Sequence, residues 1–190
     1  ITRNWGFPAS ALAMAPKLQV VGVHGTGTDR IYKAGLAARG IVLVTTAGSN
    51  AQSVAEHCIG LMLASARGVH LGHEAMQSGD FAFRGRFRGR ELSGRQLGLW
   101  GWGHISKAVA PIAQAIGMEV QVHSRHANAK LLATRGLRRV EDIAEFLGTS
   151  DVLSLHGVPE ERPIIGAEEI ALMRRGSILI NTARGALVDE

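Results

Sequence analysis

The sequence predicts a doubly wound α/β fold, in which helices cover both faces of a parallel sheet. Short apolar segments of strand length alternate along the chain with longer segments of helical periodicity, which is the pattern of βαβ units. The 190 residues include 24 glycines, which suits many tight turns between strands and helices. Because strand–helix–strand units join parallel neighbours, we expect the strands to pair in parallel.

The N-terminal part of the chain predicts one strand–helix–strand unit. An apolar strand over residues 18–23 leads into a glycine-rich turn over residues 24–29. Asp29 is the expected N-cap of a helix that ends before Gly40, and residues 41–45 form the next strand.

A second helix is expected from Ser53 to Ala66. Ser53 and Glu56 have the spacing of a capping box, and the residues that follow are apolar almost all round the helix. We therefore expect this helix to be buried, with His57 and Cys58 as structural side chains inside it. The chain has 1 cysteine, which excludes an intrachain disulfide and fits a reducing cytoplasm.

The most informative stretch is GLWGWGHIS over residues 98–106, which joins an apolar strand to an amphipathic helix. A glycine turn in this place forms the phosphate-binding corner of a Rossmann unit. Gly101 permits the tight turn, and Gly103 lets the backbone approach a pyrophosphate. The N–H groups near His104 and Ile105 then face the anion at the helix N-terminus.

One position of this motif departs from G-x-G-x-x-G, because Ser106 occupies the third glycine position. A small serine is compatible with close packing of helix and strand but weakens the match. The motif alone therefore leaves open an ordinary strand-to-helix turn that binds no cofactor.

The next strand, over residues 118–123, bears on the identity of the cofactor. An acidic residue is expected at its end, about 20 residues after the first glycine, to hold the adenosine ribose. Ser124 occupies this place, and Arg125 follows it. A missing carboxylate beside an arginine favours a 2′-phosphate, so we expect NADP(H) to be preferred over NAD(H). The alternative is that Arg125 is a solvated surface charge and that the ribose selectivity is weak.

The rest of the chain continues the alternation of strands and helices. We expect strands over residues 137–140, 151–156 and 177–182, and helices over residues 141–147 and 168–175. Ligands of such sheets bind beyond the carboxyl ends of the strands. By that rule, we expect one crevice to be lined by the turn 101–106, Ser124, Arg125, His156 and residues 182–184.

The net charge of +5 allows anionic partners, and residues 84–90 form the densest basic segment. Arginines with interleaved aromatic residues can bind nucleic acid, but a solvated connecting loop is the favoured interpretation, so we expect no nucleic-acid partner. No apolar run approaches the roughly 18 residues that a membrane span needs, so we expect no membrane partner. No metal site is expected.

The order and spacing of these segments resemble the D-isomer-specific 2-hydroxyacid dehydrogenase family nearly end to end. The segments that carry the resemblance are residues 25–29, 50–57, 89–92, 150–156 and 181–190. The resemblance implies a Rossmann-type NAD(P)-binding domain over residues 48–190. It also implies that residues 1–47 are the remnant of a smaller, flavodoxin-like substrate domain.

The resemblance also implies roles for individual residues. Arg184 matches the catalytic arginine, which binds the substrate carboxylate and polarises the carbonyl that receives hydride. The positions that match substrate contacts are Thr26, Gly27 and Asn50, and those that match the nicotinamide side are His156, Thr182 and Ala183.

The chain departs from the family pattern at its two ends and in one loop. The start of the substrate domain would precede Ile1, and the acid/base histidine with its orienting glutamate would lie beyond Glu190. The loop over residues 157–162 is shorter than in the family. We therefore expect the parent protein to be an active enzyme and the 190-residue chain alone to be inactive.

The leading hypothesis is an NAD(P)-dependent oxidoreductase, cytoplasmic and homodimeric, that prefers NADPH and reduces a small 2-oxo acid such as glyoxylate or hydroxypyruvate. One alternative is a non-catalytic dinucleotide-sensing module of the same fold. A lower-ranked alternative is a formate dehydrogenase, which Asn50 and the run over residues 53–57 would fit.

Overall fold

The computed structural model describes residues 1–2, 5–158 and 162–189. The chain divides into two compact units, Ile1–Ala51 and Gln52–Glu190. The first unit contains α1 (Ala9–Ala13), β1 (Val20–Val23), α2 (Lys33–Ala38) and β2 (Val42–Thr45). Strands β1 and β2 pair in parallel, with Val20 opposite Val42, as the strand–helix–strand pattern predicted.

The start of α2 differs from the prediction that Asp29 caps it. The helix begins at Lys33 after the N-cap residue Tyr32. Asp29 and Arg30 instead lie in a turn that Ile31 N–H closes on the Thr28 carbonyl at 3.2 Å. The carbonyl of Arg30 then accepts a hydrogen bond from Phe7 N–H, and Tyr32 N–H donates one to the Phe7 carbonyl, both at 2.9 Å. This pairing buries Ile31, and the helix starts only after it. The C-terminal end matches the prediction, since Gly40 has a φ of 63°.

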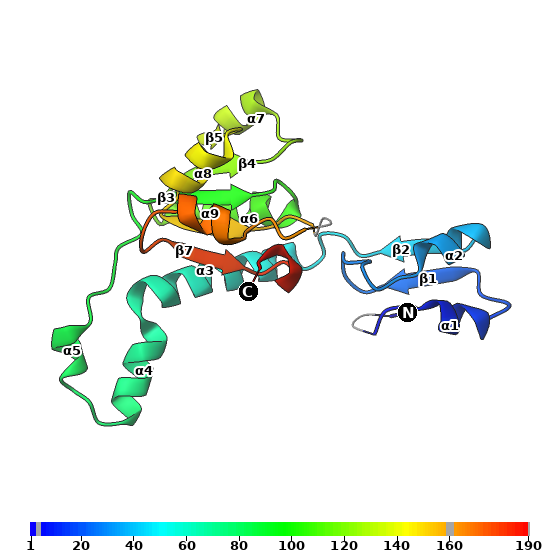
Figure 1. Cartoon of the computed structure of the whole chain (residues 1–190), viewed down its shortest axis with the longest axis horizontal. Helices are drawn as coiled ribbons and strands as arrows, with labels where there is room; N and C mark the ends of the chain where they lie inside the picture. Colours follow the sequence, from blue (N-terminus) through cyan, green and yellow to red (C-terminus); the bar gives the residue numbers. More distant parts are fainter. Residues whose placement is uncertain (3–4, 159–161, 190) are drawn as a thin grey trace. The chain divides into compact units, whose positions relative to one another are not determined.

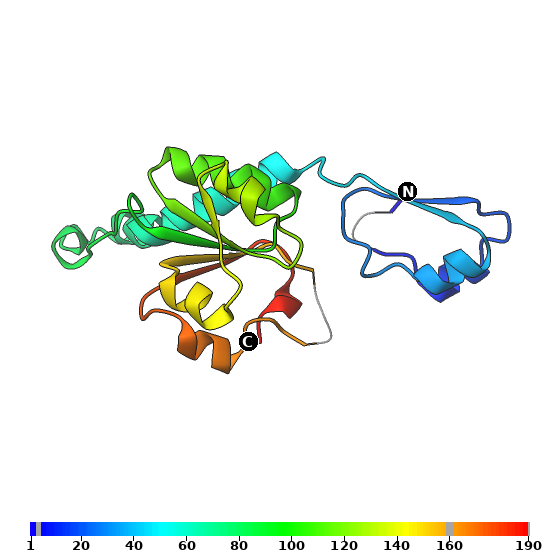
Figure 2. The same ribbon diagram turned by 90° about the horizontal axis from the view of Figure 1, so that it is seen from above.

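The second unit is built on a five-stranded parallel sheet in the order β5-β4-β3-β6-β7. The strands are β3 (Gln96–Trp100), β4 (Glu119–His123), β5 (Leu137–Arg139), β6 (Val152–Leu155) and β7 (Ile178–Asn181). Figures 1 and 2 show α3 (Ala51–Arg67) and α6 (His104–Ala115) on one face, with α8 (Ile143–Thr149) and α9 (Ala167–Leu172) on the other. The predicted doubly wound α/β fold is confirmed.

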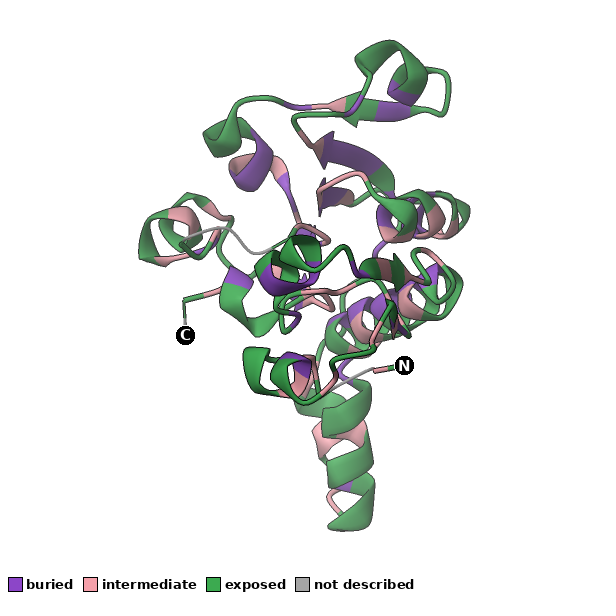
Figure 3. Ribbon diagram, turned by 90° about the vertical axis from the view of Figure 1, so that its right-hand side faces the viewer, coloured by how far each residue is buried: buried purple, intermediate pink, exposed green. Residues whose placement is uncertain are grey.

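The core of this unit lies on both faces of the sheet. All four residues of β6 are buried, as expected for a central strand that is covered on both sides. Figure 3 shows the buried residues concentrated in the strands and on the inner sides of the helices. On the α3 and α6 face, Met62 and Val109 pack with Leu99, while on the opposite face Phe146 of α8 packs with Leu153.

Helix α3 corrects two expectations. It begins at Ala51, so Ser53 lies inside the helix rather than at its N-cap, and Glu56 accepts a hydrogen bond from Gln52 Nε2 at 2.9 Å. The expected all-round burial is also wrong, because Cys58 is fully buried whereas His57 is exposed. A helix that lies on one face of a sheet can bury only one stripe of its surface there.

Residues that follow α3 form two further helices, α4 (Val69–Gln77) and α5 (Phe83–Arg86), which project from the sheet (Figure 1). The segment predicted as a basic connecting loop thus begins in a short helix. The rings of Phe83 and Phe87 stack with their centroids 5.2 Å apart, while the arginines of this segment are exposed. The remaining elements are α7 (Ala129–Ala133), which packs against β5, and the 3₁₀ helix η1 (Gly185–Leu187).

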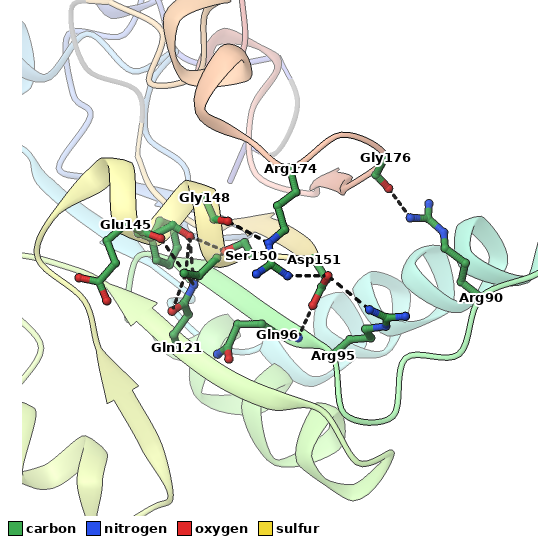
Figure 4. A network of polar contacts seen from close by, with 12 residues as sticks. Arg90, Arg95, Gln96, Gln121, Glu145, Gly148, Ser150, Asp151, Arg174 and Gly176 are labelled. Atoms are coloured by element: carbon green, nitrogen blue, oxygen red, sulfur yellow. Dashed lines mark hydrogen bonds and ion pairs between the residues drawn. The ribbon is translucent and has the colours of Figure 1, made fainter.

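A polar network holds the amino ends of the central strands (Figure 4). Asp151, just before β6, accepts a hydrogen bond from the backbone N–H of Gln96 in β3 at 2.9 Å and pairs with Arg174 at 3.1 Å. Buried Gln121 of β4 donates to the carbonyl of Phe146 at 3.0 Å. The Asp151 contacts lie at the edge of the sheet opposite the strands' carboxyl ends, while Gln121 lies in the middle of β4 and bonds that strand to α8. In the described segments, no helix is long and apolar enough to span a membrane.

Candidate functional site

The carboxyl ends of four strands form one row at a single edge of the sheet. Trp100 pairs with His123 on one side and with Leu155 on the other, and Leu155 pairs with Asn181. These paired residues are the last of their strands. The next residues along the chain therefore come together at this edge, and they are Gly101, Ser124, His156 and Thr182. Each of them is a candidate site residue from the sequence, and the strand pairing brings all four to the same edge of the sheet.

Gly101 is required by the protein's own backbone. Its φ is 98°, in the left-handed region that favours glycine, and its N–H donates to the carbonyl of His123 at 2.8 Å. A Cβ at this position would lie 3.0 Å from the carbonyl oxygen of His156. The first glycine of the motif thus forms the tight turn, as its place in the sequence predicts.

Gly103 shows a different requirement. Its φ of −93° is open to any residue, and a Cβ there would meet no described atom within 4 Å. The protein itself therefore does not need a glycine at this position, but a pyrophosphate approaching the backbone would. Gly103 is also the N-cap of α6, so the N–H groups of the first turn, including those of His104 and Ile105, have no acceptor within the helix. This arrangement fits a dinucleotide phosphate.

Ser106 has a function that sequence reasoning missed. Its side chain is fully buried, and its hydroxyl donates to the carbonyl of Gly101 at 2.8 Å. The residue at the third glycine position therefore ties the start of α6 to the glycine turn. The departure from the motif thus supplies a hydrogen bond that a glycine at this position could not make.

Ser124 and Arg125 follow β4, where the adenosine ribose of a dinucleotide would lie. Ser124 is half-buried and Arg125 is exposed. The preceding residue, His123, forms a hydrogen bond between its Nδ1 and the carbonyl of Val140 at 3.0 Å. Its ring also packs against the Trp100 ring, with the two ring centroids 4.7 Å apart. The end of β4 is therefore fixed by packing, while the arginine after it faces solvent.

His156 ends a line of polar side chains that runs into the unit's interior. Its Nε2 lies 3.0 Å from Ser154 Oγ, which in turn lies 3.0 Å from Cys58 Sγ. Burial lowers the pKa of His156 to about 4, so the ring is neutral at pH 7. Burial raises the pKa of the Cys58 thiol, against a smaller opposite effect of the hydrogen bond between Cys58 and Ser154. Sequence reasoning found His156 and the buried Cys58, but not the serine between them.

Two buried polar atoms at this edge have no hydrogen-bond partner within the part of the chain that the structure describes. They are His156 Nδ1 and Thr182 Oγ1, and their residues directly follow the paired Leu155 and Asn181. Buried polar atoms are normally satisfied. Two such atoms beside the glycine turn therefore fit a ligand that carries polar groups, as the nicotinamide half of a dinucleotide does.

Arg184 is exposed on the turn after β7, and its guanidinium donates to the carbonyl of the preceding Ala183 at 2.8 Å. Asn181 shapes this turn. Its Nδ2 donates to the carbonyl of Arg184 at 2.7 Å, and its Oδ1 accepts from the N–H of Ala183 at 3.0 Å. Sequence reasoning missed Asn181 as an organiser of the turn, although an asparagine at a strand end is typical of such side-chain-to-backbone bonds.

The first unit carries the remaining candidates. Thr26 is exposed and Gly27 half-buried in the turn after β1, and exposed Asn50 follows β2 just before α3. The turn is held by Thr46, whose Oγ1 accepts from Gly25 N–H at 2.8 Å and whose N–H donates to the Gly25 carbonyl at 3.1 Å. The loop expected to be shorter than in the family includes residues 159–161, which lie outside the described residues.

Comparison with known proteins gives a consistent result. Residues 59–190 match the family model "D-isomer specific 2-hydroxyacid dehydrogenase, NAD binding domain". The chain is 38% identical over 178 residues to a D-3-phosphoglycerate dehydrogenase of Methanocaldococcus jannaschii, covering 93% of this chain and 34% of that protein. It is 34% identical over 189 residues to a glycerate dehydrogenase of Methylorubrum extorquens, covering 96% and 57%.

Among solved structures, a glyoxylate reductase from Paecilomyes thermophila superimposes with a TM-score of 0.84 and 32% identity. That superposition covers 97% of this chain and 56% of the other. The chain thus spans between 34% and 57% of the length of these three proteins.

Proposed function

Since the chain belongs to the family of D-isomer specific 2-hydroxyacid dehydrogenases, we propose that the protein carrying it transfers a hydride between NAD(P)H and a small 2-oxo acid. The observation that carries this proposal is the row of strand ends. It places the glycine turn, His156 and Thr182 at one edge of the sheet, with Arg184 two residues further along the chain.

The residues of this edge have distinct tasks in the proposed reaction. The bound dinucleotide supplies the hydride. The turn at Gly101 and Gly103 and the N-terminus of α6 hold its pyrophosphate, while His156, Thr182 and Ala183 line the nicotinamide side. Arg184 binds the substrate carboxylate and stabilises the charge that develops on the carbonyl oxygen. Its guanidinium is too basic to donate a proton, so the reaction requires a further acid.

We propose NADP(H) as the preferred cofactor. Support comes from the end of β4, where Ser124 stands in place of the acidic residue that would hold a free ribose 2′-hydroxyl. Arg125 supplies a positive charge beside it, as a 2′-phosphate requires.

For the substrate we propose glyoxylate or hydroxypyruvate. Two relatives bear the names glyoxylate reductase and glycerate dehydrogenase, which fits small 2-oxo acids of this size. The resemblance to the family also assigns substrate contacts to the turn amides of Thr26 and Gly27 and to the side chain of Asn50. A formate dehydrogenase is the lower-ranked alternative, because Asn50 fits that class as well.

A second candidate function is dinucleotide sensing without catalysis. The open space at Gly103, and the atoms of His156 and Thr182 that have no partner among the described residues, support dinucleotide binding whatever the chemistry that follows. In that case Arg184 would have no essential role, which distinguishes this candidate from the enzyme.

We propose a cytoplasmic homodimer. Exposed apolar residues on α4 and in the segment after it, Val69, Met76 and Phe81, together with the outer side of α3, offer a surface for a second copy. The reduced, buried thiol of Cys58 is consistent with a reducing compartment.

The test uses the full-length protein that carries this chain. Oxidation of NADPH and NADH is followed with a panel of 2-oxo acids, for the wild type and for Arg184→Ala. We expect turnover with at least one acid and a loss of about 100-fold or more in the variant. The matched control is Arg135→Ala, which removes another exposed arginine and should leave turnover unchanged. Dinucleotide binding without turnover on any acid would overturn the enzyme proposal in favour of sensing.

A further inference from the structure

The two side chains that lead to His156 come from two different elements. Cys58 lies on α3, and Ser154 lies in β6, two residues before His156. Residues two apart in a strand share a face, so Ser154 and His156 face the same side of the sheet. Ser154 is fully buried, and its hydroxyl lies 3.0 Å from both Cys58 Sγ and His156 Nε2.

The hydroxyl has one proton for two hydrogen bonds, so it can donate to only one of these neighbours while the other donates to it. Either the thiol donates to Ser154 and Ser154 donates to the imidazole, or the imidazole donates to Ser154 and Ser154 donates to the sulfur. A neutral imidazole nitrogen is a strong acceptor, whereas sulfur is a weak one. The first direction therefore gives the stronger pair of bonds.

The protonation states agree with this direction. Burial raises the pKa of the Cys58 thiol, so the thiol keeps the proton that it must donate. Burial lowers the pKa of His156 to about 4, so the ring carries a single proton at pH 7. If Nε2 accepts from Ser154, that proton is on Nδ1.

We propose that Ser154, oriented by Cys58, is a positioning residue that holds His156 as the Nδ1–H tautomer, which presents an N–H donor to an acceptor oxygen of the bound dinucleotide. The inference rests on the proposed dinucleotide function. Nδ1 is the buried atom of His156 that has no partner among residues 1–2, 5–158 and 162–189, so its proton is available to a ligand.

The tautomer can be measured without any activity assay. Long-range ¹H–¹⁵N spectra of the full-length protein, labelled at histidine nitrogens, distinguish a protonated from an unprotonated ring nitrogen, and His156→Gln identifies the signals of His156. We expect a protonated Nδ1 and an unprotonated Nε2 at pH 7. The opposite pattern, with the proton on Nε2, would overturn the proposal.

Substitutions separate positioning from general stability. Ser154→Ala should give His156 a mixture of the two tautomers, and Cys58→Ser should preserve the wild-type pattern because a hydroxyl can donate in place of the thiol. Ser150→Ala is the matched control, since Ser150 is also a fully buried serine but donates to the carbonyl of Phe146 at 2.7 Å. An unchanged tautomer in folded Ser154→Ala would contradict the proposal.

The consequence for the ligand is measured by titration with NADPH and NADH. Ser154→Ala should weaken binding of the dinucleotide by up to about fivefold, because only the fraction of the protein with the Nδ1–H tautomer is competent to bind, while Cys58→Ser and Ser150→Ala bind as the wild type does. Equal affinity in Ser154→Ala would contradict the role toward the ligand. Failure of the wild type to bind either dinucleotide would instead contradict the proposed function, and the tautomer spectra would remain a separate result.

Discussion

Asn181 holds the backbone of Arg184 in a closed turn. The amide Nδ2 donates to the Arg184 carbonyl at 2.7 Å, and Oδ1 accepts from the N–H of Ala183 at 3.0 Å. One side chain thereby bonds the backbone of both Ala183 and Arg184, and Arg184 carries the proposed catalytic guanidinium. Beyond the turn, buried Leu187 accepts hydrogen bonds from the N–H groups of Ile164 and Ile165 at 3.0 Å, which anchors its far end.

Asn181→Ala should therefore reduce kcat in the full-length protein by about tenfold, because a small displacement of a catalytic group is costly. The dissociation constant for the dinucleotide should change by less than about twofold, since the pyrophosphate turn is untouched. Asn128→Ala is the matched control, because its side chain also accepts from a backbone N–H, of Leu131 at 3.1 Å, at the start of α7. An equal fall in kcat in both variants would contradict a specific role of Asn181.

Substitution by alanine should affect the free energy of unfolding strongly at Gly101 and only weakly at Gly103. Gly101→Ala combines a φ of 98° with a Cβ that would lie 3.0 Å from the His156 carbonyl oxygen, and should lower the free energy of unfolding by about 3 kcal/mol. Gly103→Ala should change it by less than about 1 kcal/mol, because the added methyl group points into open space.

Although Gly103→Ala should barely change stability, it should strongly weaken dinucleotide binding. We expect the affinity for NADPH to fall by at least about tenfold, because the methyl group occupies the space where a pyrophosphate would approach. Chemical denaturation and fluorescence titration measure the two quantities on the same samples. Normal NADPH affinity in Gly103→Ala would place the phosphate elsewhere.

Arg125→Ala tests the cofactor preference. Loss of the guanidinium should weaken binding of NADPH by about tenfold and leave NADH within about twofold, because only NADPH carries the 2′-phosphate. In the wild type, the difference in affinity between NADPH and NADH should also become smaller as the salt concentration increases, since the arginine is exposed. Arg135→Ala should change neither affinity. An equal effect of Arg125→Ala on both cofactors would show that it does not read the ribose.

The half-buried His156 should make the protein sensitive to acid. Its pKa is lowered by burial from 6.5 to about 4 in the folded state, so below pH 6.5 the unfolded chain binds a proton that the folded chain does not. Stability from this residue is fully present above pH 6.5 and falls progressively by about 3 kcal/mol as the pH decreases to about 4. The neighbouring titratable group, the Cys58 thiol, stays protonated throughout this range.

The measurement is the free energy of unfolding between pH 4 and pH 7, for the wild type and for His156→Gln. The variant should lose this part of the pH dependence, although the carboxylates and other histidines keep theirs. Parallel curves for the two proteins would show that His156 is not the group responsible.

The order of the strands and of the helices α2, α3, α6, α8 and α9 was accessible from the sequence, because hydrophobic periodicity and turn residues are local properties of the chain. The same is true of the glycine turn at Gly101 and Gly103 and of the position of Arg184 after the last strand. The helices α1, α4 and α7 were not predicted. Helix starts were less accessible. Asp29 and Ser53 have the chemistry of caps, but pairing of Ile31 with Phe7 delays α2, and α3 already begins at Ala51.

Burial and long-range hydrogen bonds were decided by the tertiary structure. An apolar helical sequence predicts that the helix is buried, but only packing determines which side of it is buried. Helix α3 buries Cys58 and leaves His57 exposed. The contact between Cys58 and Ser154 joins residues 96 positions apart, and no local pattern encodes such a distance.

By itself, then, the sequence determined the fold class, the family and the residue types at the strand ends, since each follows from short stretches of chain. Only the tertiary structure aligned the strand ends into one row through the pairing of Trp100 with Leu155 and of Leu155 with Asn181. It also gave Ser106, Ser154 and Asn181 their partners. The physical reason is that a hydrogen bond depends on distances of about 3 Å, which are set when the helices pack on the sheet and not by the residues' order.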